Sequence, residues 1–211
     1  MKNSAGKPVL LKIVAAIHQG KDYLSEIDGL IGDGDHGMNM NKGFSMFADE
    51  ARDKDLSFSE GLYDLGFLLF NQIGGSMGPI YGTIFMNMGE AAEKKEEIDL
   101  DVFAGMLQAG LTGLSDIVEA RAGDKTLMDT LIPANEALQK AAGEGKSFQE
   151  ALADMKAAAE AGRDSTKDLA AKYGRSSRLG ERSRGVLDAG AVSCCMILSA
   201  MADGIIEQMG A

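Results

Sequence analysis

One stretch decides the fold class of this chain: Ser57-Phe-Ser-Glu-Gly-Leu-Tyr-Asp-Leu-Gly-Phe-Leu-Leu-Phe-Asn-Gln-Ile73. Within it, Leu62, Leu65 and Leu69 are followed by Ile73, so apolar residues recur every three or four positions. This spacing places them on one side of an α-helix. The same spacing continues in both directions along the sequence, without a sustained alternation of period two. The sequence therefore predicts an all-α fold.

Helix start and stop signals lie on both sides of this stretch. Pro8 is placed as a first-turn proline, and Ser147-Phe-Gln-Glu150 forms a capping box. We expect Asp124 to open a helix that is bent or interrupted at Pro133. The first predicted helix begins at Pro8 and has an apolar face that reaches residue 17. Further helices are predicted over about 21–31, 39–53 and 57–73, from just after 79 to about 94, and from 99 or 101 to about 122. The last ones begin at 124 and at 147, and the final one covers about 188–209.

Length, charge and cysteine content limit the classes of function. The 211 residues are enough for one domain, residues 1–211, and show no repeat or dividing linker. A net charge of −11 argues against nucleic acid as a partner. No run approaches the roughly 20 apolar residues that span a bilayer, and Lys12 interrupts the N-terminal apolar run, so we expect neither membrane insertion nor a signal peptide. The only cysteines, Cys194 and Cys195, are adjacent, which favours a cytoplasmic location.

The candidate chemistry is concentrated in Asp28-Gly-Leu-Ile-Gly-Asp33-Gly-Asp35-His36-Gly-Met-Asn39. Its carboxylates supply the hard oxygen ligands that Mg²⁺ prefers, and their mutual repulsion calls for a cation. The alternative is a solvated turn with helix caps. A calcium-binding EF-hand is excluded, because Met38 would take the place of the invariant glycine and Phe44 that of the final glutamate. We therefore expect a metal site that serves a phosphate ligand.

Three further segments are candidates for anion contacts. Gly74-Gly75-Ser76 could present free backbone N–H groups to a phosphate, or could be a tight corner between helices. No Walker A motif accompanies it. Gly123-Asp-Lys-Thr126 is explained equally well by a helix N-cap at Asp124. The segment from Gly174 to Gly185 carries four arginines in an acidic chain, which favours an anion contact over a plain surface loop.

Together and in this order, these segments resemble the nucleotide-binding L subunits (DhaL) of dihydroxyacetone kinase. The landmarks are Ile31-Gly-Asp-Gly-Asp-His-Gly-Met-Asn-Met40, Gly74-Gly-Ser-Met-Gly-Pro79, Gly123-Asp-Lys-Thr-Leu-Met-Asp129 and Leu179-Gly-Glu-Arg-Ser183. The resemblance covers nearly the whole chain. It implies a barrel of about eight antiparallel helices with a nucleotide site at one end, and a kinase subunit that holds Mg-ADP or Mg-ATP.

The resemblance also implies roles for individual residues. Asp28, Asp33 and Asp35 would hold two Mg²⁺ ions that bridge the nucleotide phosphates. Arg175 would contact the nucleotide and stabilise charge during phosphoryl transfer. The other residues implied in cofactor binding are His36, Gly37, Met38, Asn39, Gly75, Ser76, Leu127, Asp188, Ala189 and Gly190.

The implied partners are a separate DhaK-type subunit, which presents dihydroxyacetone to the γ-phosphate, and a DhaM-type phosphocarrier of the phosphotransferase system, which recharges ADP. The chain departs from the family at Gly185-Val-Leu-Asp-Ala-Gly-Ala191, where the pattern is close to Gly-His-x-Asp-Pro-Gly-Ala. Because of this departure, a paralogous subunit for another short keto-sugar, such as a tetrulose, stays open. A non-catalytic nucleotide-binding module that regulates a partner also stays open, as does a homodimer.

Overall fold

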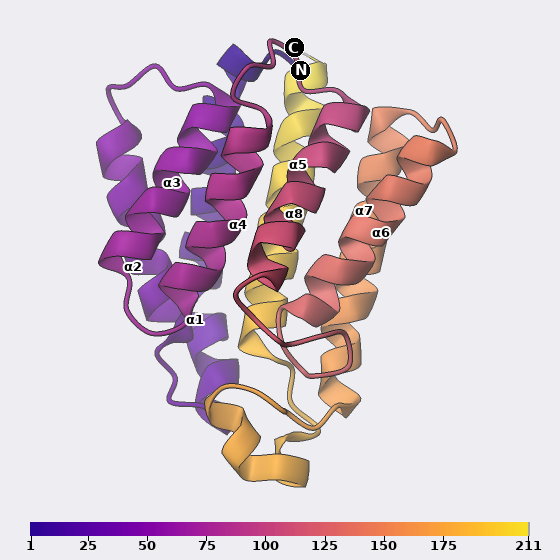
Figure 1. Ribbon diagram of the computed structural model, residues 1–211. Coiled ribbons are helices and arrows are strands. Elements are labelled where there is room, and N and C mark those ends of the chain that lie inside the picture. Colours follow the sequence, from indigo (N-terminus) through magenta and orange to yellow (C-terminus); the bar gives the residue numbers. More distant parts are fainter. Residues whose placement is uncertain (211) are drawn as a thin grey trace.

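The computed structural model describes residues 1–210, and the all-α prediction is confirmed within that range (Figure 1). Three short 3-10 helices, η1 (Asn3–Ala5), η2 (Thr166–Asp168) and η3 (Arg175–Ser183), accompany the α-helices. The α-helices are α1 (Lys7–Ile31), α2 (His36–Ala51), α3 (Phe58–Gln72), α4 (Met77–Ala91), α5 (Leu100–Ser115), α6 (Met128–Gly143), α7 (Phe148–Ser165) and α8 (Ala189–Met209).

The α-helices form a closed ring. Each helix packs against the next one in the chain, and α8 returns to pack against α1. Successive helices run in opposite directions, so the α1–α2, α3–α4, α5–α6 and α7–α8 connections gather at one end of the barrel (Figure 1). This end carries η3, and we call it the η3 end. Both termini lie at the opposite end (Figure 1).

Large aromatic side chains fill the middle of the barrel. Phe44 and Phe85 are each no more than 1% exposed, and their rings meet edge to face with centroids 6.1 Å apart. The ring of Tyr81 stacks on that of Phe85 from the neighbouring turn of α4. Burial of such side chains is the main favourable contribution to folding. The packed interior therefore holds the helices rigid while their connecting loops build the η3 end.

The cap signals agree with the structure where they are local. Ser147 forms the expected capping box with Glu150 at the start of α7, and Ser57 forms another with Glu60 at the start of α3. The Asp99 carboxylate accepts the Val102 N–H at the start of α5. These contacts satisfy backbone donors that the first helical turn leaves free.

Three predicted helix boundaries are wrong. The ranges 8–17 and 21–31 form one continuous helix, α1, because its buried face continues past Gly20 through Leu24 and Ile27. Helix α5 ends at Ser115, well before residue 122. Asp124 does not cap a helix, because the next residue, Lys125, has a left-handed backbone with φ of 60°.

Helix α6 instead begins at Met128 and continues through Pro133 without interruption. Pro133 lacks an N–H and so leaves the carbonyl of Asp129 without its usual helical donor. Gly162 of α7 packs directly against this carbonyl, where an added Cβ would lie 2.0 Å from the oxygen. The carbonyl that lacks its helical hydrogen bond in α6 therefore lies in the contact between α6 and α7.

Helix α8 is long and apolar enough, by length and composition, to cross a membrane. Most of its apolar surface is buried inside the barrel, where it packs against α1, α6 and α7. A core helix of a globular protein has the same composition. The apolar content of α8 is therefore explained by its packing against α1, α6 and α7.

Candidate functional site

A cleft of about 770 Å³ opens at the η3 end of the barrel. Its walls come from the α1–α2 loop, the α3–α4 loop, the α5–α6 loop and residues 173–176 and 188–190. These segments are far apart in the sequence and meet because the antiparallel helices return to the same end (Figure 1). The cleft is large enough for a ligand of nucleotide size.

The acidic cluster lies on one wall of this cleft. Asp28, Asp33 and Asp35 each offer a carboxylate oxygen, and these oxygens all lie within 4.8 Å of one another. Gly32 ends α1 by donating its N–H to the Asp28 carbonyl at 2.5 Å, and Gly34 adopts a left-handed φ of 77°. The tight turn folds the chain back, so that both later carboxylates return to Asp28. This all-oxygen, anionic donor set fits Mg²⁺.

Arg175 of η3 reaches across the cleft and forms an ion pair with Asp33. The Arg175 side chain is 61% exposed and so remains free to exchange this partner for another anion. The contact joins the two segments that the sequence marked as metal-binding and anion-binding. A phosphate bound to a metal on the aspartates would lie within reach of the arginine fork.

A hydrogen-bonded network lies beneath the acidic cluster. The His36 N–H donates to an Asp28 carboxylate oxygen at 3.3 Å, and the His36 Nε2 lies 2.8 Å from the Ser193 hydroxyl. The Tyr81 hydroxyl lies 2.7 Å from the same oxygen and also donates to the Gly190 carbonyl. Burial lowers the pKa of His36, and the charge of Asp28 opposes this shift. Burial also raises the pKa of Tyr81 well above its usual value. The side chains of His36 and Tyr81 are therefore uncharged, and their hydrogen bonds to Ser193 hold the floor of the cleft in place.

The α3–α4 loop supplies the kind of backbone that an anion site requires. Gly75 adopts φ of 74°, and no atom lies within 4 Å of where its Cβ would be. Ser76 is the N-cap of α4, and its side chain makes no capping hydrogen bond. The first N–H groups of α4 are therefore available at the cleft. Both residues line the cleft, as the phosphate-binding prediction requires.

The remaining wall comes from the start of α8 and the loop before α6. Leu127, Asp188, Ala189 and Gly190 all line the cleft. The Asp188 carboxylate accepts the Ala191 N–H at 2.8 Å and caps α8. Burial raises the pKa of Asp188 to about 6. This group supports the cleft wall as a helix cap.

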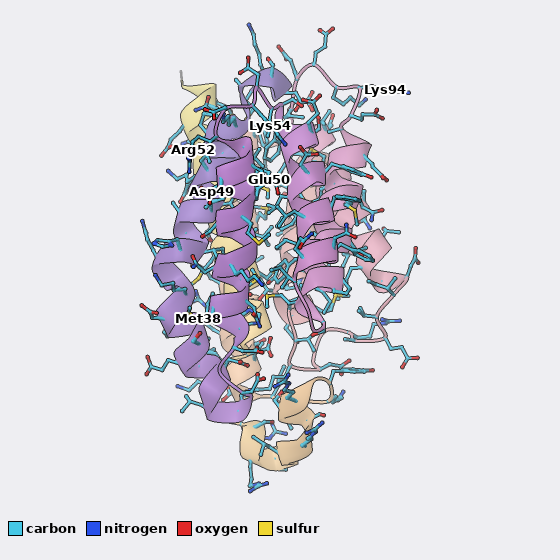
Figure 2. The ribbon with its side chains drawn as sticks, turned by 90° about the vertical axis from the view of Figure 1, so that its left-hand side faces the viewer. Met38, Asp49, Glu50, Arg52, Lys54 and Lys94 are labelled. Atoms are coloured by element: carbon cyan, nitrogen blue, oxygen red, sulfur yellow. The ribbon has the colours of Figure 1, made fainter. Side chains whose placement is uncertain are left out.

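Two of the expected cofactor-binding residues do not line the cleft. Met38 is 54% exposed on the outer face of α2 (Figure 2). Gly37 is buried where α2 crosses α1, and an added Cβ would lie 1.8 Å from the Lys21 carbonyl oxygen. Its small size therefore serves helix packing. His36 and Asn39, their neighbours in the motif, do line the cleft.

Sequence reasoning missed several residues of the cleft and of the hydrogen-bonded network beneath it. Ser193 and Tyr81 lie in apolar helical stretches whose pattern indicates only burial. Tyr173 lines the cleft beside Arg175, and Lys125 and Thr126 line it from the loop before α6. The last two belong to the Gly-Asp-Lys-Thr landmark, which we interpreted as a helix cap. That landmark was the one signal that could have led to them.

Comparisons with known proteins show which family the chain belongs to. The DAK2 domain family matches residues 30–203. The ADP-binding subunit DhaL of PEP-dependent dihydroxyacetone kinase 1 from Listeria innocua is 38% identical over 186 residues, which cover 88% of each chain. The L-erythrulose kinase of Pectobacterium atrosepticum is 32% identical over 94% of this chain, which corresponds to 35% of that longer protein.

The fold also has a relative among solved structures. The dihydroxyacetone kinase of C. freundii, solved in complex with AMP-PNP and Mg²⁺, superposes with a TM-score of 0.69 at 22% identity, over 92% of this chain and 33% of that one. At this identity the likeness shows the fold alone. The family match and the similarity over 88% of each chain together show that this chain belongs to the DAK2 family, as the L subunits of dihydroxyacetone kinase do.

Proposed function

We propose that this chain, as a single nucleotide-binding domain, is the phosphoryl-transfer subunit of a dihydroxyacetone kinase. It holds Mg-ADP or Mg-ATP in the cleft and passes the γ-phosphate to dihydroxyacetone bound on a separate DhaK-type subunit. One observation carries the proposal. Three carboxylates, whose oxygens lie within 4.8 Å of one another, share one cleft with an arginine and a glycine turn. The relative from Listeria, named an ADP-binding subunit, supports the choice of nucleotide.

Each wall of the cleft has a separate task in this proposal. The aspartates would hold two Mg²⁺ ions, which neutralise phosphate charge and align the terminal group. The N–H groups at Gly75 and Ser76 would bind phosphate oxygens, and Leu127 would contact the adenine. Arg175 would leave Asp33 and bind the transferring group, where it stabilises the charge of the transition state. Phosphoryl transfer requires this alignment and charge compensation more than a protein nucleophile.

The name of the Listeria relative also specifies PEP dependence. By the resemblance, a DhaM-type phosphocarrier would then recharge ADP while the nucleotide stays bound to this cytoplasmic subunit. A resident nucleotide should remain with the protein during purification. Native mass spectrometry tests this directly, since the full chain should carry ADP and magnesium through dialysis. A chain that emerges free of nucleotide, and that binds none by calorimetry at millimolar Mg-ADP, would overturn the proposal.

Transfer itself is tested by combining the chain with a DhaK-type subunit and following the phosphorylation of dihydroxyacetone. The erythrulose kinase relative and the altered segment at 186–189 favour a tetrulose as a second candidate substrate. A panel of dihydroxyacetone and erythrulose, compared by kcat/KM, separates the two. Tight ADP binding without transfer to either sugar would identify a regulatory module instead.

A further inference from the structure

Lys125 is unusual for a lysine in both its backbone and its burial. It is 1% exposed, and it is the one residue other than glycine with a left-handed φ in the part of the chain that the structure describes. Such a backbone disfavours any residue that carries a Cβ, and a buried ammonium is costly unless it is hydrogen-bonded. Both costs require compensation from specific contacts.

The compensating contacts come from two distant parts of the chain. The Lys125 ammonium donates to the Thr166 carbonyl and to the Val186 carbonyl, each at 2.5 Å. These carbonyls lie at the beginning and near the end of residues 166–188, which we call the η2–η3 segment. A single side chain from the α5–α6 loop therefore holds both ends of this segment.

Asp124 holds the same segment between those ends. The Lys172 ammonium lies 2.6 Å from its carboxylate, and the Lys172 N–H donates to its carbonyl at 3.2 Å. The other carboxylate oxygen accepts the Arg121 N–H at 2.7 Å, which fixes the orientation of the group. Lys172, which Asp124 holds in this way, lies three residues before Arg175 in the sequence.

The loop that carries Asp124 and Lys125 is itself fixed. The Asp129 carboxylate, in the first turn of α6, accepts the Gly123 N–H at 2.5 Å and the Thr126 N–H at 2.8 Å. In contrast, η3 protrudes from the end of the barrel (Figure 1). The contacts of Arg184 with Asp168 and Glu181 lie within the η2–η3 segment and do not attach it to the barrel.

We infer that Asp124 and Lys125 are positioning residues, which clamp the η2–η3 segment to the barrel and so place Arg175 over the phosphate site. The clamp itself is inferred from geometry alone. Its consequence for catalysis rests on the proposed function. It assigns a role to the Gly-Asp-Lys-Thr segment that a helix cap does not explain.

The test uses the full chain and the variant Lys125→Met, which keeps the length of the side chain and removes the ammonium. Hydrogen exchange followed by mass spectrometry should show amides of 166–188 exchanging about tenfold faster or more, with α3 and α4 unchanged. Lys146→Met is the matched control, because Lys146 forms its ion pairs at the opposite end of the barrel. Lys172→Met is the second variant, since Lys172 is 65% exposed and its loss does not threaten folding.

Calorimetry with Mg-ADP tests the positioning role. Lys125→Met should weaken binding about tenfold, and Lys125→Arg should recover part of the loss. In an Arg175→Ala background, the same Lys125→Met change should cost less than about twofold, because the residue that it positions is absent. If Lys125 only supported the fold, the two substitutions would weaken Mg-ADP binding independently, and their fold-losses in affinity would multiply.

Two results would overturn the inference: unchanged exchange over 166–188 in both Lys125→Met and Lys172→Met, or affinity losses that multiply in the double variant. If the unaltered chain binds no Mg-ADP, the proposed function fails, and the exchange experiment still decides the clamp. Faster exchange confined to 166–188 would then support the clamp without its catalytic consequence.

Discussion

The acidic cluster should make ligand-free protein less stable and ligand binding stronger, and Asp35→Asn separates these two effects. Asp35 forms no ion pair among the described residues, whereas Asp33 pairs with Arg175. Its carboxylate oxygen lies within 4.8 Å of those of Asp28 and Asp33, so two repulsive pairs disappear in the variant. At this distance each repulsion is worth about 0.9 kcal/mol with the dielectric constant of water, which suits Asp35 because its side chain is exposed.

The expected net effect on the ligand-free protein is smaller than the sum of the two repulsions. Asp35 is also the N-cap of α2, where a negative charge gains about 0.3–1 kcal/mol from the helix dipole. Asparagine is as good a cap but lacks that charge. We therefore expect a gain of about 1 kcal/mol, which raises the melting temperature of a domain of this size by about 2–4 °C.

Binding should change in the opposite direction. Loss of one anionic ligand to the bound metal should weaken Mg-ADP binding by about 100-fold or more, because the partner charge is left without compensation. Calorimetric melting with and without Mg-ADP measures both effects in one series. At 100 times its dissociation constant, the ligand should stabilise the unaltered protein by about 2.7 kcal/mol and the variant much less.

The control is Asp49→Asn, which removes a carboxylate of α2 at the end away from η3 (Figure 2). Its exposed ion pair with Arg52 contributes little, so stability and affinity should both stay near the values of the unaltered protein. The reasoning is refuted if Asp35→Asn binds Mg-ADP within about twofold of the unaltered protein. A fall in the melting temperature of the ligand-free variant would contradict the repulsion argument.

Three further predictions concern the frame of the site. Gly162→Ala should cost about 2–4 kcal/mol of unfolding free energy, since its Cβ would lie 2.0 Å from a carbonyl oxygen of α6. Ser193→Ala should cost about 1–3 kcal/mol, because His36 and Tyr81 both lose a buried partner. The pKa of Asp188 is raised to about 6, above roughly 3.9 in the unfolded chain, so its contribution to the stability of the ligand-free protein is fully present below about pH 4 and is lost as pH rises through 6. Asp188→Asn should therefore flatten the stability curve over that range.

Each of these three predictions can be measured directly, and each has an outcome that would contradict it. Denaturant unfolding gives the free energies, and Gly143→Ala is the matched glycine control, since no atom lies within 4 Å of its Cβ position. Equal costs for the two glycine variants would contradict the close packing of α6 on α7. An unfolding free energy for Ser193→Ala equal to that of the unaltered protein would show that these hydrogen bonds do not contribute to stability. An unchanged stability curve for Asp188→Asn between pH 4 and 7 would exclude Asp188 as its source.

Local signals in the sequence determined most of the fold. The apolar spacing of 57–73, the capping boxes at Ser57 and Ser147, and the glycine break at Gly74 and Gly75 each act within one or two helical turns. The acidic cluster was equally readable, because its carboxylates lie within one short turn that glycines allow. Such features need no information from distant parts of the chain.

The tertiary structure decided what depends on contacts between distant segments. Helix α6 begins at Met128, after the left-handed backbone of Lys125, whose ammonium bonds the carbonyls of Thr166 and Val186 far along the chain. Arg175 meets Asp33 because the barrel closes and brings η3 over the end of α1. The sequence thus determined the helices and the acidic turn, whose causes are local, whereas ring closure alone set the partners of the buried lysine, the arginine and the hydroxyl network.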